Sequence, residues 1–209
     1  MTGRRLLLAA STAIGVIAAF LVAVATLAPE GSSAAPSVPA EDSADVGFAR
    51  DMAVHHQQAV EMSFLVRDRT QDEDVRLLAF DIINTQANQR GMMLGWLDLW
   101  DMPKSTSTPM TWMPGHAGMT GGAGEGGLAA MPGMATDEQL DELRAAEGRE
   151  SEVLFLQLMI EHHRGGVEMA QAAAAEAGTE EVDRLATGIV EAQEAEIGLM
   201  RDMLAERGA

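Results

Sequence analysis

The chain has 209 residues, of which 47% are hydrophobic, and this suits one domain with a short extension. Its formal charge of −18 excludes nucleic acid as a partner, because phosphates would be repelled. The absence of cysteine excludes disulfides and thiolate metal sites. Scarce aromatic residues and abundant Ala, Leu and Glu predict an all-α protein with an aliphatic core.

The N-terminal segment 1–28 carries Arg4 and Arg5, followed by an uncharged apolar run from Leu6 to Ala28. About 20 apolar residues suffice to cross a bilayer as a helix. We interpret the segment as a membrane anchor in preference to a cleaved signal peptide. Because the arginines should stay cytoplasmic, the rest of the chain is expected to be extracytoplasmic, periplasmic or at the cell surface. The following residues 29–43, rich in Pro, Ser and Ala, are typical of a flexible tether.

A duplicated helical domain is predicted over residues 44–209. Its first hairpin covers 44–100, with Ser43 as N-cap of the first helix and a capping box at Thr70–Glu73 opening the second. A Met- and Gly-rich loop, 101–135, lacks any periodicity. The second hairpin, 136–209, begins with a short helix capped by Thr136 and continues with helices ending near 177 and 206.

Shifting the chain by 107 residues superposes "MAVHHQQAVEM" (52–62) on "MIEHHRGGVEM" (159–169), and the register continues without a gap into the next helix. Two amphipathic hairpins cannot each bury an apolar stripe alone. We therefore expect them to pack as a four-helix bundle whose halves are related by a pseudo-two-fold axis.

The doubled motif predicts a metal site on the inward helix faces. Neighbouring histidines diverge by about 100° on a helix, so one of each pair ligates while the other borders the site or reaches another helix. Met62 lies too far along the helix axis to share an ion with His55 of the same helix. The pseudo-two-fold axis allows ligands from the other half to meet it instead. The candidate ligands are His55, His56, His162, His163, Met52, Met159, Met62 and Met169.

Polar residues interrupt the apolar stripe of the second helix in each hairpin: Gln86 and Gln89 in the first, Gln193 and Glu196 in the second. Buried polar groups need partners, and the imidazoles of other helices are the obvious ones. A ligating histidine commonly donates its second N–H to a carboxylate or amide. We expect Gln86, Gln193 and Glu196 to support the metal ligands in this way.

Donor chemistry selects the metal. Di-iron and di-manganese bundles use Glu-x-x-His, whereas this chain has a methionine three residues before His55 and before His162. Thioether and imidazole without thiolate favour Cu(I), or the chemically similar Ag(I), over iron, manganese or magnesium. The cofactor expected is therefore a copper ion.

The loop offers further soft ligands at three-residue spacing, and they are expected to have no core to fill. We interpret the loop as a flexible arm that captures a soft ion, with Trp112 available to cover a cation. Its candidate ligands are Met110, Met113, His116, Met119, Met131 and Met134.

These segments resemble the Domain of Unknown Function 305 family. The resemblance rests on "FARDMAVHHQQAVEMS", "LAFDIINTQ", "PGMATDEQLDELRAAEG", "FLQLMIEHHRGGVEMA" and "LATGIVEAQEAEIGLM". It implies a ferritin-like fold, and some members of the family are periplasmic copper-binding proteins involved in copper tolerance. The resemblance nominates the same eight Met and His residues. The usual Gln-x-x-Glu-Ile survives as Gln193, Glu196 and Ile197, but the first copy has Gln89 and Arg90, so the two half-sites are expected to differ in affinity.

The leading hypothesis is a non-enzymatic, extracytoplasmic protein that binds Cu(I), Ag(I) or Cu(II) for sequestration, tolerance or delivery, with a copper-handling protein as a partner. One alternative is a ferritin-like oxidase with two metal ions near Glu196 and the histidine pairs. It is disfavoured by the scarcity of inward carboxylates. A second alternative is a metal-free bundle whose His and Gln side chains satisfy one another.

Overall fold

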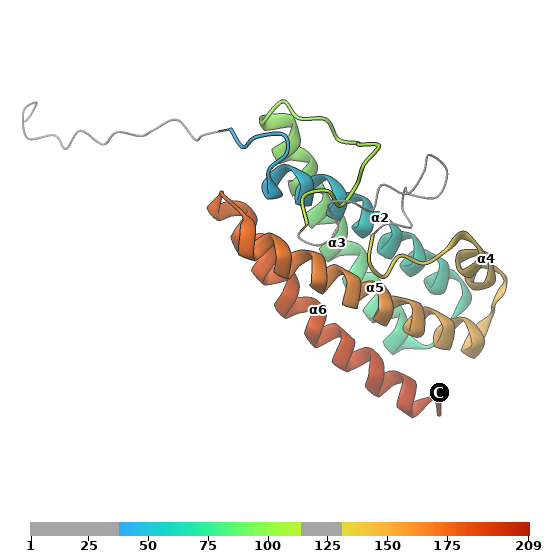
Figure 1. Cartoon of the computed structure of the whole chain (residues 1–209). Coiled ribbons are helices and arrows are strands. Elements are labelled where there is room, and N and C mark those ends of the chain that lie inside the picture. The colour runs from blue at the N-terminus through green and yellow to red at the C-terminus, as the bar shows by residue number, and fades with distance from the viewer. Residues whose placement is uncertain (1–37, 114–130) are drawn as a thin grey trace, which may run out of the picture. The chain divides into compact units, whose positions relative to one another are not determined.

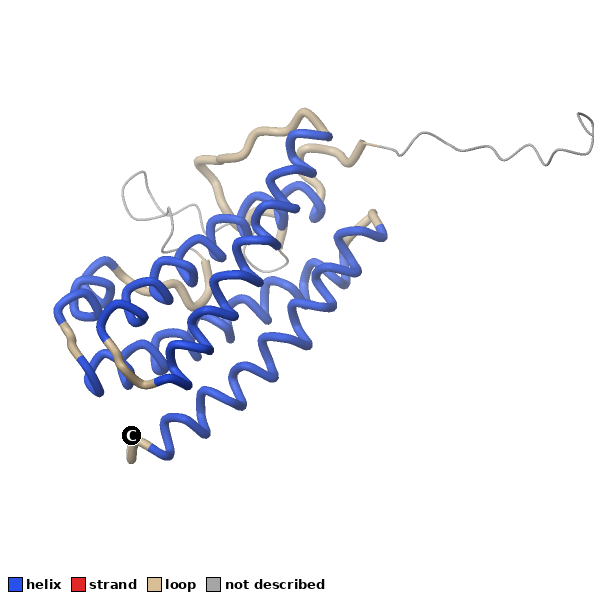
Figure 2. The backbone as a smooth tube through the Cα atoms, turned by 180° about the vertical axis from the view of Figure 1, so that it is seen from behind, coloured by secondary structure: helices blue, strands red, loops and turns tan. Residues whose placement is uncertain are grey.

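The computed structural model describes residues 38–113 and 131–209, in which all regular structure is helical (Figures 1 and 2). The prediction of an all-α protein is thereby confirmed for these residues. The helices, listed with their bounds, are α2 (Ala44–Arg69), α3 (Glu73–Leu99), α4 (Asp137–Ala145), α5 (Gly148–Glu176) and α6 (Glu180–Glu206). The predicted anchor 1–28 lies outside the described residues. None of the described helices has an apolar stretch able to span a bilayer.

Local capping explains where the helices begin. The Ser43 side chain accepts a hydrogen bond from Val46 N, and Thr136 forms the predicted capping box with Gln139. The capping box predicted at Thr70 is wrong. Asp72 is the N-cap of α3, while the Thr70 hydroxyl donates to the Glu152 carboxylate at 2.5 Å. Thr70 is the C-cap of α2, and its hydroxyl accepts from Asp72 N, so the chain enters α3 two residues later, at Asp72.

Helices α2 and α3 pack as one hairpin, α5 and α6 as another, and the two hairpins meet through α2 and α5. The short helix α4 packs against both central helices (Figure 1). Helices α3 and α6 flank the central pair and do not pack closely against each other. This leaves the central α2–α5 contact to position the residues singled out by the duplication.

Reciprocal contacts tie each hairpin to the turn of the other. The Asp45 carboxylate, in the first turn of α2, accepts hydrogen bonds from Gly178 N, Thr179 N and the Thr179 hydroxyl. Its counterpart 107 residues later, Glu152, accepts from Thr70 and Arg207. Both contacts follow the sequence duplication.

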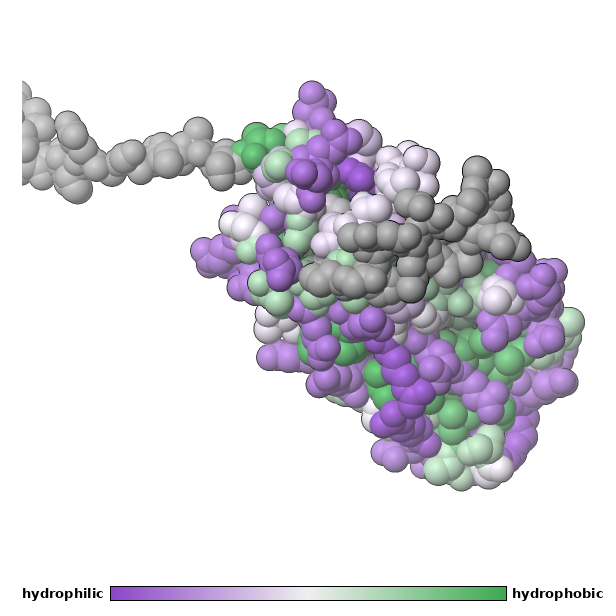
Figure 3. All heavy atoms as spheres, viewed as in Figure 1, coloured by the Kyte–Doolittle hydropathy of each residue, from purple (hydrophilic) through white to green (hydrophobic). Residues whose placement is uncertain are grey.

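The hydrophobic core consists of two clusters. One contains Met62, Phe155 and Met159, and the other contains Phe48, Met52 and Met169. Along α2 and α5 the four motif histidines fall between these clusters, and all four are fully buried. On the face drawn in Figure 3, polar side chains alternate with apolar strips. Along the central helices the histidine layer thus lies between two apolar clusters of the core.

Candidate metal centre

His55 of α2 and His162 of α5 meet at the centre of the molecule. Their ring centroids are 3.8 Å apart and their planes are inclined by 34°. These two residues occupy the same position in the two copies of the motif. The structure therefore brings together histidines that lie 107 residues apart in the sequence.

The second histidine of each pair points to the outer helix of its own hairpin. His56 Nε2 lies 2.8 Å from Gln89 Oε1, and His163 Nε2 lies 2.7 Å from Glu196 Oε2. The divergence expected from helical geometry is observed. Since Gln89 and Glu196 are counterparts in the duplication, one half-site rests on an amide and the other on a carboxylate.

The central histidines also have oxygen partners at Nε2. His55 Nε2 lies 3.0 Å from the Pro132 carbonyl oxygen, and His162 Nε2 lies 3.1 Å from the His55 carbonyl oxygen. Carbonyl and carboxylate oxygens only accept, so the hydrogen bonds assign the proton to Nε2. Each neutral imidazole then carries its lone pair on Nδ1.

Within residues 38–113 and 131–209, none of the four Nδ1 atoms has a hydrogen-bond partner, although all are buried. The side-chain amides of Gln86 and Gln193 are likewise buried with both polar atoms unpartnered. The prediction that imidazoles would satisfy these two glutamines is therefore wrong, whereas Glu196 does support a histidine. Buried groups left unpaired cost about 1–3 kcal/mol each, so this layer is costly unless something binds there.

Burial keeps three of these histidines, His55, His56 and His162, neutral. Removal from water lowers the pKa of His55 to about 4, although the Pro132 carbonyl opposes the effect. Burial and the neighbouring His55 lower the pKa of His56 to about 3. The pKa of His162 is also lowered, first by burial and then by the other histidines. At neutral pH these imidazoles can bind a cation without first losing a proton.

The four motif methionines, Met52, Met62, Met159 and Met169, are fully buried. Met52 shares a core cluster with Met169 and Met62 shares the other with Met159, so each cluster receives a thioether from both halves. The expectation that Met62 shares an ion with residues of the other half stays a prediction.

Residues 131–135, which lead into α4, hold His55 in place. The Gln58 side-chain amide donates to the Ala135 carbonyl and accepts from Ala135 N, while Pro132 accepts from His55. A Cβ at Gly165 would lie 2.0 Å from the Pro132 carbonyl oxygen, so only glycine permits this approach. Sequence reasoning missed Gln58 and Gly165. Gln58 and Gly165 occupy the same position in the two halves of the duplication. The change from glutamine to glycine at this position was the sequence signal that could have identified them.

The loop methionines differ from expectation. Met110, Met113 and Met131 are buried in the cluster that contains Met52, so the inference that they had no core to fill is wrong. Asp51 anchors this part of the loop by accepting hydrogen bonds from Met110 N and Trp112 Nε1. The Trp112 ring packs against Gly47 and edge-on against Phe48. Met134 is half-buried, and His116 and Met119 lie outside the described residues.

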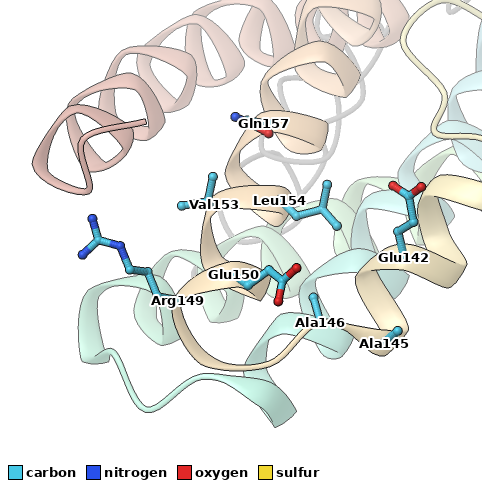
Figure 4. Close-up of a pocket in the computed structure, with 8 residues that line it drawn as sticks. All are labelled: Glu142, Ala145, Ala146, Arg149, Glu150, Val153, Leu154 and Gln157. Atoms are coloured by element: carbon cyan, nitrogen blue, oxygen red, sulfur yellow. The ribbon is translucent and has the colours of Figure 1, made fainter.

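In the described part of the chain, no three His, Asp or Glu side chains are grouped to hold a metal ion. A pocket of about 720 Å³ lies between α4 and the start of α5 (Figure 4). Its lining, which includes Glu142, Arg149 and Glu150, contains none of the predicted ligands. The chemistry available at the centre of the molecule is therefore imidazole nitrogen with nearby thioether sulfur.

Together these features define a class: an all-helical protein with two duplicated hairpins and a buried, incompletely hydrogen-bonded histidine layer. The family model described as "Domain of unknown function (DUF305)" matches residues 45–204, and the chain belongs to this family. The family resemblance of the sequence is thus confirmed. No curated protein matches the chain.

Solved structures with this fold include relatives from two named bacteria. A DUF305 protein from Streptomyces coelicolor, described as secreted, is 58% identical; the match covers 81% of this chain and 96% of that one, with a TM-score of 0.72. A DUF305 fragment from Deinococcus radiodurans is 32% identical, with 78% and 96% covered and a TM-score of 0.64. CopM in its Cu(II)-bound form is 27% identical, with 76% and 94% covered and a TM-score of 0.59.

Proposed function

We propose that this protein binds copper, preferably as Cu(I), outside the cytoplasm, for sequestration, tolerance or delivery. The two hairpins would form a ferritin-like four-helix bundle around the ion. One observation carries the proposal: four fully buried imidazoles have Nε2 directed at oxygen acceptors and Nδ1 without a partner. That is the arrangement in which a supporting group fixes the tautomer of a metal-ligating histidine.

The donor set favours a soft ion. Among the described residues, Glu196 has the only carboxylate bonded to the motif histidines, whereas both adjoining core clusters contain buried thioethers. Imidazole suits either oxidation state of copper, and thioether favours Cu(I) or Ag(I). The similarity to CopM, crystallised with Cu(II), supports copper as the metal.

The loop methionines enter the proposal in a revised role. Because Met110, Met113 and Met131 pack in the same cluster as Met52, they would extend the supply of thioethers toward the protein surface. Met134, and the undescribed His116 and Met119, would complete the capture arm. The similarity to a secreted protein from Streptomyces coelicolor supports an extracytoplasmic location.

The alternatives fit less well. A di-metal oxidase would need bridging carboxylates, and Glu196 is the single candidate among the residues bonded to the histidines. A metal-free bundle would leave the histidine Nδ1 atoms and both glutamine amides unsatisfied. The metal-free bundle therefore leaves the unpartnered nitrogens unexplained, and the oxidase lacks the carboxylates that its two ions would need.

The test is an anaerobic titration of the full-length protein with Cu(I) against a chromophoric chelator. We expect the protein to withdraw Cu(I), and replacing His55, His56, His162 and His163 by Asn to abolish this. Met92→Leu is the matched control, because Met92 is exposed and outside both clusters. Failure of the wild-type protein to compete for Cu(I) would refute the proposal, and two iron or manganese ions per purified chain would favour the oxidase.

A further inference from the structure

A groove of about 450 Å³ lies between α3 and α6, where these helices do not pack closely. Leu77 and Leu199 line it and are 60% and 50% exposed, and Leu78 and Met203 complete its apolar lining. Apolar side chains left this accessible beside a continuous groove are typical of interaction sites. Of the described residues, five carboxylates and no Lys or Arg line the same groove: Asp74, Asp81, Glu196, Asp202 and Glu206.

The duplication shows that the fold does not require this charge. The residues 107 positions away from the lining residues form the equivalent set at the other end of α3 and α6. That set contains one acid, Glu181, and one base, Arg184. The other carboxylate positions are taken by Gly188, Gln89, Gly95 and Leu99. Only one of two equivalent sites therefore carries a concentrated negative charge.

Two of these acids oppose the helix dipole. Asp202 and Glu206 lie near the carboxyl end of α6, where the last turn has no basic residue and the C-cap, Arg207, forms its ion pairs with Asp72 and Glu152. Negative charge at this end costs a helix a few tenths of a kcal/mol or more, whereas Asp74 at the start of α3 is favourable. Helix stability therefore accounts for Asp74 but not for Asp202 and Glu206.

We propose that the groove is the docking site for a cationic amphipathic helix of a partner protein. An apolar floor between two acidic walls is complementary to a helix with a Leu-rich stripe flanked by Lys or Arg. A second copy of this chain is a poor occupant, because each copy has a formal charge of −18. From Glu196 to Glu206 the wall spans about 15 Å at about 1.5 Å per residue, which matches some three turns of helix.

The groove also reaches the proposed metal layer. Glu196 lines it, retains 22% side-chain exposure and accepts the hydrogen bond of the fully buried His163. A docked Lys or Arg that pairs with Glu196 competes with His163 for the carboxylate and weakens the support of that imidazole. Docking and metal retention are then reciprocally coupled, a step that rests on the proposed copper function.

The first experiment measures docking to the metal-free full-length protein. The probe is a fluorescent synthetic peptide of about 14 residues with Leu on one face and Lys on the other. The groove variant D74N/D81N/D202N should weaken binding about tenfold, as expected for the loss of three exposed charge pairs. The matched control D68N/D183N/E191Q removes equal charge from exposed positions outside the groove and should leave binding unchanged.

Several outcomes decide the docking claim. Equal loss of peptide binding in the groove variant and in the control variant would overturn it, because the attraction would then be unspecific. Unchanged binding in both variants would also overturn it, because the peptide would then bind elsewhere. A sequence-scrambled peptide of the same composition should bind much more weakly, and equal binding would also refute an amphipathic helix as occupant. Self-association of the protein that the groove variant abolishes would assign the groove to a second copy.

The second experiment repeats the Cu(I) competition with saturating peptide. Peptide should weaken Cu(I) retention by the wild-type protein and have no effect on Glu196→Gln. Unchanged retention in the wild type would overturn the coupling while leaving copper binding intact. Absence of Cu(I) binding without peptide would refute the proposed function alone, since docking is measured on metal-free protein.

Discussion

Each motif histidine combines one nitrogen with an oxygen partner and one buried nitrogen without a partner. The proton therefore resides on Nε2, and the lone pair on Nδ1 is available to a cation. The central histidines bond different carbonyl groups, and the outer ones differ in kind, because His56 faces the Gln89 amide and His163 faces the Glu196 carboxylate. A carboxylate partner raises the basicity of an imidazole, so His163 should be a stronger electron-pair donor to a metal ion than His56.

Stability of the metal-free protein should depend on pH through these residues. His55 and His56 have a pKa of about 4 and about 3 in the folded protein, against 6.5 for an unperturbed histidine. Between pH 4 and pH 6.5 the unfolded chain binds more protons than the folded protein. The contribution of His55 and His56 to the free energy of unfolding is therefore complete above pH 6.5 and is lost as pH falls toward 4. The loss should amount to a few kcal/mol. Urea denaturation at several pH values measures it, and a pH-independent free energy of unfolding between 6.5 and 4 would contradict the assignment.

The amide–carboxylate difference predicts opposite effects of two exchanges. Glu196→Gln should lower Cu(I) affinity by about tenfold or more, and Gln89→Glu should raise the affinity of the other half-site. Chelator competition measures both. Glu194→Gln, an exposed neighbour that bonds no histidine, is the control. Identical affinities for wild type and Glu196→Gln would show that this carboxylate does not support a metal ligand.

At the scale of elements, the connection from residue 131 to α4 matters as much as the helices. It crosses α5 so closely that Cβ atoms at Gly133 and Gly165 would collide with backbone oxygens. Gly133 also has a φ of 74°, which favours glycine. The connection delivers the Pro132 carbonyl to His55 and is fixed at Ala135 by Gln58. One non-helical segment thus orients a central imidazole.

Gly165→Ala should displace this segment, because the new Cβ would meet the Pro132 carbonyl at 2.0 Å. We expect a loss of about 1–3 kcal/mol in the free energy of unfolding. Gly198→Ala is the matched control: nothing lies within 4 Å of its Cβ, so alanine should stabilise α6 by about 0.5–1 kcal/mol. Chemical denaturation measures both, and a neutral Gly165→Ala would disprove the close contact.

At the scale of the whole domain, the two hairpins hold each other at both ends. Asp45 bonds the α5–α6 turn, and Glu152 bonds Thr70 before α3. These contacts act together with the α2–α5 packing, which aligns the two copies of the motif. The histidine layer therefore depends on the relative position of the hairpins.

Asp45→Ala should destabilise the protein by about 2 kcal/mol, because the amides of Gly178 and Thr179 lose their acceptor. Asp42→Ala, at an exposed nearby position, should change stability by less than about 0.5 kcal/mol. Thermal and urea unfolding provide the comparison. Equal effects of the two substitutions would show that Asp45 does not join the hairpins.

Much of the fold was determined by local sequence. Periodicity and capping residues located the helices, and the repeated Met-x-x-His-His motif identified the candidate ligands, since both signals act within a few turns. The Thr70 capping box failed because Thr70 is the C-cap of α2 and α3 begins after Asp72, whose side chain accepts from Val75 N. Two acceptor residues lie within three positions there, and the sequence pattern selected the wrong one.

Only the tertiary structure decided how the ligands are held. It selected the oxygen partner of each Nε2, brought the rings of His55 and His162 to a centroid distance of 3.8 Å and left Gln86 and Gln193 without partners among the described residues. It also placed three loop methionines in the core. These features join residues far apart in the chain, and their geometry arises from the packing of α2 against α5, which helical periodicity alone does not encode.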